Sequence, residues 1–82
     1  MFEVIFLTPQ KVLFEGQSES IILPGEKGTF EVMSFHKDLL TRLLRGWVII
    51  DKREKIPIQR GVVKIERNTV TIIAEPPYKA KE

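Results

Sequence analysis

Residues 23–32, LPGEKGTFEV, contain the strongest turn signal in the chain and decide its fold class. Pro24 restricts its φ to about −65°, and Gly25 and Gly28 provide positions at which φ can be positive. Segments typical of strands flank this turn, over residues 18–23 and 29–33. The pattern therefore predicts a β-hairpin.

Similar short segments extend from this hairpin toward both ends of the chain. On the N-terminal side, residues 2–7 form an opening strand, and an extended run over residues 11–15 ends at a bend at Gly16. On the C-terminal side, residues 47–50 and 56–59 flank a charged tip, and residues 62–66 and 69–74 flank a tight turn at Arg67-Asn68. Pro57 lacks an amide donor, so its strand should lie at a sheet edge or carry a bulge.

The segment from His36 to Arg45 is compatible with two structures. Leu39, Leu40, Leu43 and Leu44 have a helical spacing, and Asp38 could cap a first turn. A helix this short would be marginal alone, and the neighbouring segments are all of the strand type. We therefore expect a strand or extended segment here, with a short helix as the alternative.

Together these segments predict an all-β chain of about eight to ten short strands, folded as a flattened β-sandwich or barrel. Residues 1–75 form one domain, and residues 76–82, which begin with Pro76-Pro77, form a short charged tail. The expected core consists of Val4, Phe6, Val12, Phe14, Ile22, Val32, Leu40, Leu43, Trp47, Ile49, Ile58, Val63, Ile65, Val70 and Ile72.

Composition excludes several classes of function. The chain has no cysteine, so it has neither a disulfide framework nor a thiolate nucleophile. Its 13 basic and 11 acidic residues are scattered rather than gathered into the stripe typical of nucleic-acid binders. Apolar runs of about four residues are far shorter than the roughly 20 needed to cross a bilayer.

No catalytic, metal or cofactor site is predicted. Gly25 and Gly28 lack the Gly-Lys-Ser/Thr ending of a phosphate-binding loop. His36 is the only histidine, so a site with several imidazole ligands cannot be built from one chain. Ser34, His36 and Asp38 suggest a triad, but the nucleophile elbow and oxyanion loop are missing. His36 is therefore interpreted as an exposed loop or interface residue.

The order and spacing of these motifs resemble the N-terminal β-domain of the F-type ATP synthase epsilon subunit. The matching stretch is LPGEKGTFEV at residues 23–32, followed by HKDLLTRL at residues 36–43 and by Gly46. Residues 30–31 and 34–36 depart from the family, which commonly has a Leu-Gly step and a Pro-Gly-His step there. The family usually adds a C-terminal helical hairpin that regulates ATP hydrolysis, and no such role is assigned to this sequence.

The resemblance implies a non-catalytic central-stalk subunit that binds the gamma subunit and rests on the c-ring. It would couple the two during proton-driven or sodium-driven ATP synthesis. It implies a peripheral location on the cytoplasmic face of the inner or plasma membrane, held through the complex without membrane insertion or a cofactor. On matching positions, a loop from Gly28 to Asp38 would face the ring and part of gamma. The expected contact residues are Thr29, Phe30, Glu31, Phe35, His36 and Asp38.

Within that loop, two nearby aromatic residues are typical of an interface, and one of Phe30 and Phe35 is expected to be core. Two other functions remain open. The chain could be a free-standing interaction or assembly module that binds gamma, or a small nucleic-acid-binding barrel that stacks bases on Phe30, Phe35 and Trp47. Basic residues do not interleave with these aromatics, which disfavours the barrel.

Overall fold

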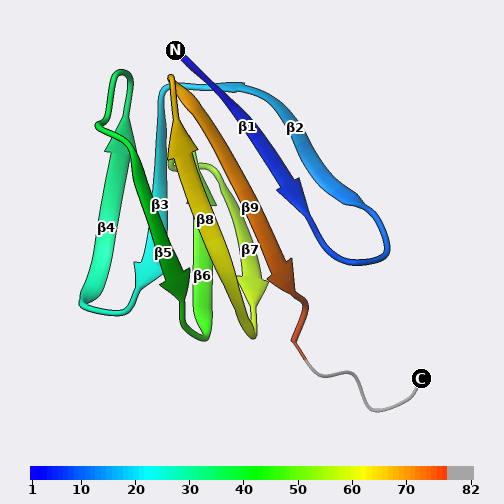
Figure 1. The fold of residues 1–82 in the computed structure, drawn as a ribbon. Helices are drawn as coiled ribbons and strands as arrows, with labels where there is room; N and C mark the ends of the chain where they lie inside the picture. Colours follow the sequence, from blue (N-terminus) through cyan, green and yellow to red (C-terminus); the bar gives the residue numbers. More distant parts are fainter. Residues whose placement is uncertain (78–82) are drawn as a thin grey trace.

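The fold is entirely β over the part of the chain that the structure, a computed structural model, describes, residues 1–77 (Figure 1). This confirms the predicted fold class and the expected strand or extended structure for residues 36–45, and it excludes the short helix. Those described residues form nine strands: β1 (Phe2–Leu7), β2 (Val12–Ser18), β3 (Ser20–Gly25), β4 (Gly28–Met33), β5 (Leu39–Leu43), β6 (Gly46–Ile50), β7 (Glu54–Ile58), β8 (Arg60–Glu66) and β9 (Thr69–Glu75).

Three hairpins follow directly from local turn chemistry. The β3–β4 hairpin pairs Gly25 with Gly28 across a two-residue turn, and Gly28 has a φ of 121°. The β8–β9 hairpin turns at Arg67 and Asn68, whose φ angles are 52° and 62°. Positive φ at both residues is typical of a type I′ turn, whose twist matches that of the flanking strands. The β6–β7 hairpin joins the two segments predicted to flank a charged tip.

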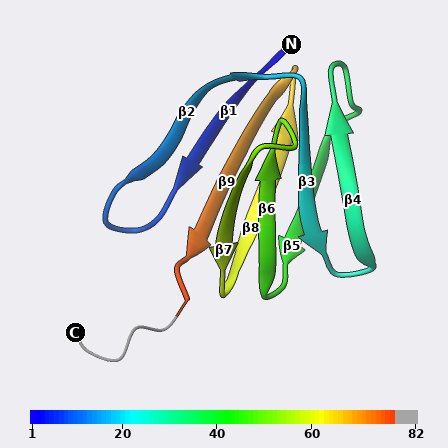
Figure 2. The ribbon, with the colours of Figure 1, turned by 180° about the vertical axis from the view of Figure 1, so that it is seen from behind.

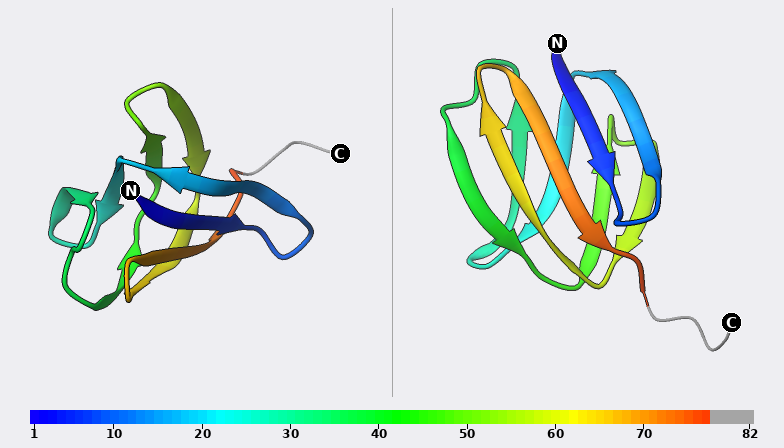
Figure 3. Two further views of the ribbon diagram at one scale, coloured as in Figure 1. Left: turned by 90° about the horizontal axis from the view of Figure 1, so that it is seen from above. Right: turned by 45° about the vertical axis from the view of Figure 1, so that its right-hand side comes forward.

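The strands form one hydrogen-bonded sheet that is bent into two layers (Figures 1 and 2). Its order is β2-β1-β9-β8-β5-β3-β6-β7, and β4 pairs with β3 outside this path. The bend lies between β5 and β3, which share a single bridge from Leu43 to Gly25. One layer therefore contains β2, β1, β9, β8 and β5, and the other contains β4, β3, β6 and β7. The view from above in Figure 3 shows the layers curling around a common interior.

Strand β1 forms a hairpin with β2 on one side and lies parallel to β9 on the other. Val4 pairs with Val70 and Phe6 with Ile72, which brings the two ends of the domain together in the centre of one layer. Pro57 lies on β7, an edge strand of the other layer, as predicted.

The core lies between the two layers. Its fully buried apolar side chains are Phe2, Val4, Phe6, Ile21, Leu23, Val32, Leu43, Val48, Ile50, Ile58, Val63, Ile65, Val70, Ile72 and Ala74. Leu13, Phe14, Phe30, Leu39 and Ile56 are partly buried and pack against this cluster.

Several core predictions were wrong. On β3 the buried residues are Ile21 and Leu23, with Ile22 only half-buried. On β6 the buried residues are Val48 and Ile50, so Trp47 and Ile49, which were predicted as core, lie on the outer face. Leu40 and Val12 are also exposed, and Phe14 is half-buried. In β3 and β6 the apolar residues follow one another without interruption. Such a run does not show which of its alternating side chains face the core.

The predicted bend at Gly16 was also wrong. Strand β2 does not end at Gly16 but continues to Ser18, because Gly16 pairs with Val4 within the β1–β2 ladder. The chain instead turns at Glu19, before β3. The last strand ends at Glu75, and Pro76-Pro77 follow it, whereas the rest of the expected tail, residues 78–82, lies outside the described residues.

Candidate functional site

The predicted contact segment Gly28–Asp38 consists of a strand and a short connection, which corrects the expectation of a single loop. Thr29, Phe30 and Glu31 lie on β4, and Phe35, His36 and Asp38 lie in the connection from β4 to β5. In a strand, successive side chains point to opposite faces. Thr29 and Glu31 therefore face outward and are exposed, whereas Phe30 faces inward and packs against the core.

Hydrogen bonds between backbone groups and the side chains of Asn68 and Asp38 fix the connection between β4 and β5. The N–H of Phe35 donates to Oδ1 of Asn68 at 2.7 Å, and the N–H of Arg67 donates to Oδ1 of Asp38 at 3.3 Å. Asn68 in turn donates to the C=O of Met1 at 2.8 Å. The connection is thus tied to the β8–β9 turn and to the start of β1.

Phe35 is held in the left-handed region, with a φ of 64°. A bulky residue rarely adopts this conformation, and it occurs where the surrounding structure imposes it. Here the result is an aromatic side chain that is 85% exposed. The two aromatic residues are thus distinguished as expected: Phe30 contacts the core and Phe35 projects into solvent.

Other apolar side chains are exposed at the same end of the sandwich. Met33, the last residue of β4, is 55% exposed, and Leu40, the second residue of β5, is 69% exposed. Neither was predicted as a contact residue, and Leu40 was expected in the core. Met33 could have been found from the sequence, because it alternates with buried Val32 on β4. With Phe35 they form what we call the apical apolar set.

Charged and polar groups surround the apical apolar set. His36 donates from Nδ1 to the C=O of Lys37 at 2.8 Å, so its ring is oriented by its own connection. Glu31 forms an ion pair with Lys52 of the β6–β7 tip, with 3.9 Å between Oε2 and Nζ. An exposed pair of this length contributes little to stability, so Glu31 can exchange partners.

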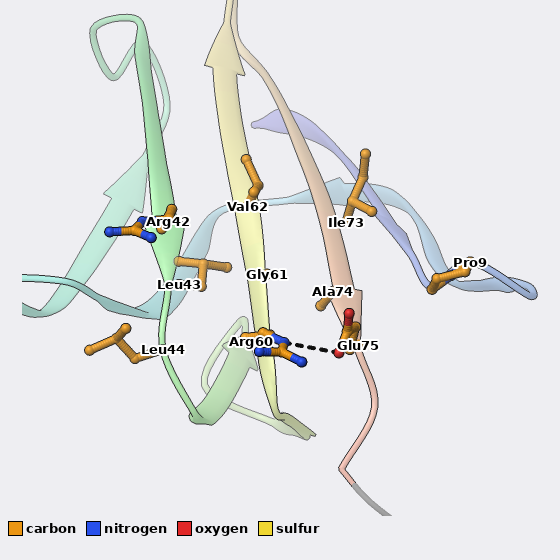
Figure 4. Close-up of a pocket in the computed structure, with 10 residues that line it drawn as sticks. All are labelled: Pro9, Arg42, Leu43, Leu44, Arg60, Gly61, Val62, Ile73, Ala74 and Glu75. Atoms are coloured by element: carbon orange, nitrogen blue, oxygen red, sulfur yellow. Dashed lines mark hydrogen bonds and ion pairs between the residues drawn. The ribbon is translucent and has the colours of Figure 1, made fainter.

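A shallow apolar depression lies on the outer face of β5, β8 and β9. It has a volume of about 450 Å³, and Figure 4 shows Val62 and Ile73 on neighbouring strands within it, with Leu44 on the segment after β5. Arg60 closes one end through an ion pair with Glu75, at 3.0 Å. This surface was not predicted from the sequence, although the exposed Val62 and Ile73 alternate with buried neighbours. An apolar wall with paired charges at its rim is suited to contact with another protein.

Within residues 1–77, no three histidine or acidic side chains gather in a way that could hold a metal ion. The same residues contain no helix able to span a membrane. The surface of these residues presents exposed apolar side chains with polar groups around them.

Fold and surface together define a small β-sandwich domain whose exposed features suit protein contacts. The family model described as ATP synthase, Delta/Epsilon chain, beta-sandwich domain matches residues 1–80. The chain belongs to this family.

Named relatives agree with this assignment. The chain is 36% identical over 77 residues to an ATP synthase epsilon chain of Endomicrobium trichonymphae, covering 90% of this chain and 56% of the relative. It is 37% identical over 73 residues to that of Sulfurimonas denitrificans, covering 84% and 56%. The chain thus spans a little over half the length of these relatives.

Solved structures share the fold. A chain of the central stalk and c-ring structure of Tetrahymena thermophila mitochondrial ATP synthase superposes with a TM-score of 0.81 at 20% identity, covering 98% of this chain and 67% of that one. A chain from the Euglena gracilis mitochondrial ATP synthase gives a TM-score of 0.77 at 14% identity, covering 87% and 48%.

Proposed function

We propose that this chain is a non-catalytic central-stalk (rotor) subunit of an F-type ATP synthase, in which it couples the gamma subunit to the c-ring. The observation that carries the proposal is the family match over residues 1–80, because the family is defined by ATP synthase delta and epsilon chains. Relatives named ATP synthase epsilon chain support it. So does the likeness to a chain in a central stalk and c-ring structure.

The contact surface in this proposal is the end of the sandwich that carries β4 and its connection to β5. Phe35 is its apolar anchor, and Glu31, His36 and Asp38 supply a polar rim. Interfaces typically combine a desolvated aromatic anchor with a rim whose charges guide encounter. Thr29 and Phe30 contribute through β4 itself. In the complex, the subunit lies peripherally on the cytoplasmic face of the membrane.

A two-layer sheet suits this role mechanically. Close-packed protein interiors have low compressibility and transmit strain, so a domain with a continuous core can pass a load between two partners. The single core cluster of this sandwich extends over both layers. Ion passage and ATP synthesis would occur in other subunits.

Co-purification tests the proposal. Affinity-tagged chain, expressed with gamma and the c-ring of the same organism, should recover both partners in a fixed ratio. Recovery of gamma alone in variable amounts would instead favour the assembly-module alternative. Binding to nucleic acid that weakens steeply with salt, without recovery of either subunit, would favour the nucleic-acid alternative and refute the rotor assignment.

A further inference from the structure

In the described part of the chain, strand β4 has one edge that is not paired with another strand. Strand β4 hydrogen-bonds to β3 alone, so within residues 1–77 its other edge has no strand partner. Figure 2 shows β4 at the outer margin of its layer, with β3 on one side. An unpaired edge presents a row of N–H and C=O groups that can pair with another strand.

The strands at the two ends of the sheet order, β2 and β7, carry features that oppose such pairing, and β4 does not. Strand β7 contains Pro57, which cannot donate to a ladder. Strand β2 has a register shift opposite Phe6 and Leu7, and bulges of this kind disrupt regular pairing. Strand β4 contains neither proline nor lysine, and it pairs with β3 over six successive residues without a shift.

Hydrogen bonds of β3 identify which β4 groups face outward. The C=O of Pro24 accepts from the N–H of Leu44 at 2.8 Å, and the C=O of Ser20 accepts from the N–H of Asp51 at 2.8 Å. Both groups therefore point away from β4. In antiparallel strands such residues alternate with those that bond across the pair. Their partners on β4, Thr29 and Met33, must likewise turn their backbone groups away from β3.

The same alternation includes Glu31, which lies between Thr29 and Met33. The C=O of Met33 is already used, because it accepts from the N–H of His36 at 3.2 Å. Thr29 and Glu31 make no backbone hydrogen bond to another part of residues 1–77 on this edge. The N–H and C=O groups of Thr29 and Glu31 are therefore free to hydrogen-bond at this edge. Their alternation of donors and acceptors, and the spacing between the two residues, match the backbone of another extended strand.

A cavity lies beside this edge, between the layers. Its volume is about 350 Å³, and it is lined by Gly28, Thr29 and Phe30 of β4, by Leu39 and Thr41 of β5, and by the β3–β4 turn. Phe30 and Leu39 are only partly buried against the core. An apolar side chain projecting inward from an added strand would enter this cavity and cover both.

We propose that β4 accepts an extended segment of a partner polypeptide as an added strand, held by the backbone of Thr29 and Glu31. An inward apolar side chain of that segment fills the cavity beside Phe30 and Leu39. This is recognition by β-augmentation, in which backbone pairing supplies affinity and alternate side-chain pockets supply specificity. The inference rests on backbone geometry and goes beyond the rotor assignment.

The occupant is a linear segment of a partner and not β4 of a second copy. In a second copy, the inward side chains of β4, Phe30 and Val32, are already packed against that copy's own core. They therefore cannot also fill the cavity of the first copy. A segment that has no sheet of its own is free to direct an apolar residue inward.

A defined peptide tests the proposal on the intact chain. The probe is an acetylated and amidated Lys-Thr-Val-Thr-Val-Thr-Lys peptide, and the control is the same peptide N-methylated at alternate residues, which lacks donors on one edge. The probe should slow amide hydrogen exchange at Thr29 and Glu31 and leave the β2 and β7 edges unchanged. The N-methylated peptide should have no effect.

Two substitutions at one position separate backbone from side chain. Thr29→Pro removes the outward N–H but no hydrogen bond between β3 and β4, because Thr29 and Pro24 form a non-hydrogen-bonded pair of the antiparallel ladder. It should weaken peptide binding by about tenfold or more, whereas Thr29→Ala should bind like the parent. If Thr29→Pro fails to fold, amide hydrogen exchange of the parent protein with the probe peptide and with the N-methylated peptide still tests the proposal.

Three results would overturn the proposal. They are equal binding of both peptides, protection at β2 or β7 instead of β4, and no protection at millimolar peptide. Dimerisation of the free chain that protects Thr29 and Glu31 would identify a second copy as the occupant and would also refute it. None of these results bears on recovery of gamma and the c-ring, so failure here is distinct from failure of the rotor assignment.

Discussion

Asp51 joins the tip of the β6–β7 hairpin to the corner between β2 and β3, and its removal should be costly. Its carboxylate Oδ1 accepts from the N–H of Glu19 at 2.8 Å and from the N–H of Ser20 at 3.2 Å. Its own N–H donates to the C=O of Ser20 at 2.8 Å. The contact spans about thirty residues of chain and closes one end of the second layer.

The expected cost follows from two separable effects. Hydrogen bonds to a charged group contribute about 1.5 to 3 kcal/mol, and Asp51 has a left-handed φ of 53°, which penalises an alanine side chain by roughly 1 kcal/mol. Allowing for partial exposure, Asp51→Ala should lower the free energy of unfolding by about 2 to 3 kcal/mol. Asp51→Asn retains an oxygen acceptor and tolerates the left-handed region, so it should lose about 1 kcal/mol.

The contribution of Asp51 should also depend on pH. The backbone N–H of Glu19 lowers the pKa of the Asp51 carboxyl below its ordinary value, against an opposing effect of burial. A carboxyl with a depressed folded-state pKa stabilises the fold above its unfolded pKa of about 3.9 and loses that contribution as pH falls through the folded value. Stability of the parent should therefore decline below about pH 4 more than that of Asp51→Asn.

Urea unfolding followed by tryptophan fluorescence, at pH 7 and at several values below pH 4, measures both effects. Asp51→Gly is the matched control, because it removes the carboxylate without the left-handed penalty and should fall between the parent and Asp51→Ala. An Asp51→Ala protein with the parent's unfolding midpoint would refute the role given to these hydrogen bonds. An unchanged acid dependence in Asp51→Asn would refute the pKa argument.

Further expectations concern the contact surface and the core. Phe35→Ala should fold normally and weaken binding to gamma and c-ring by about 1 to 3 kcal/mol, measured by titration calorimetry; parental affinity would place the anchor elsewhere. Glu31→Lys should weaken the same binding modestly, with a loss that shrinks as salt is raised, and a salt-independent loss would contradict a rim role. Leu23→Ala should lower the free energy of unfolding by about 2 to 5 kcal/mol, whereas Leu40→Ala should change it by less than about 0.5 kcal/mol. Similar values for the two leucines in denaturant unfolding would mean that the assignment of faces is wrong.

The sequence predicted strand positions better than strand faces. Pro24 restricts φ, and Gly28 and Asn68 accept the positive φ that their turns require, so hairpins could be located from local chemistry alone. The inward face of β3 could not, because Ile21 and Ile22 are equally apolar and only the second layer distinguishes them.

At the candidate site, too, the sequence predicted the segment but not which of its side chains are exposed. Two aromatic residues in a polar segment indicated a contact surface, but which of them is exposed depends on tertiary contacts. The backbone of Phe35 is held by a hydrogen bond to Asn68, a residue of a distant hairpin. Likewise, the unpaired edge of β4 depends on the bend between β5 and β3, which no short motif encodes.

The parallel pairing of β1 with β9 has a consequence for synthesis on the ribosome. Strand β1 is the first to emerge, yet one of its two neighbours is complete only when residue 75 has been added. The β1–β2 hairpin must therefore wait, with its Phe2 and Phe6 side chains uncovered, until nearly the whole domain has been translated. Topologies dominated by such distant contacts fold in about milliseconds to seconds. The interval before β9 arrives is thus the period in which the nascent chain is most exposed to aggregation and has the greatest need of chaperones.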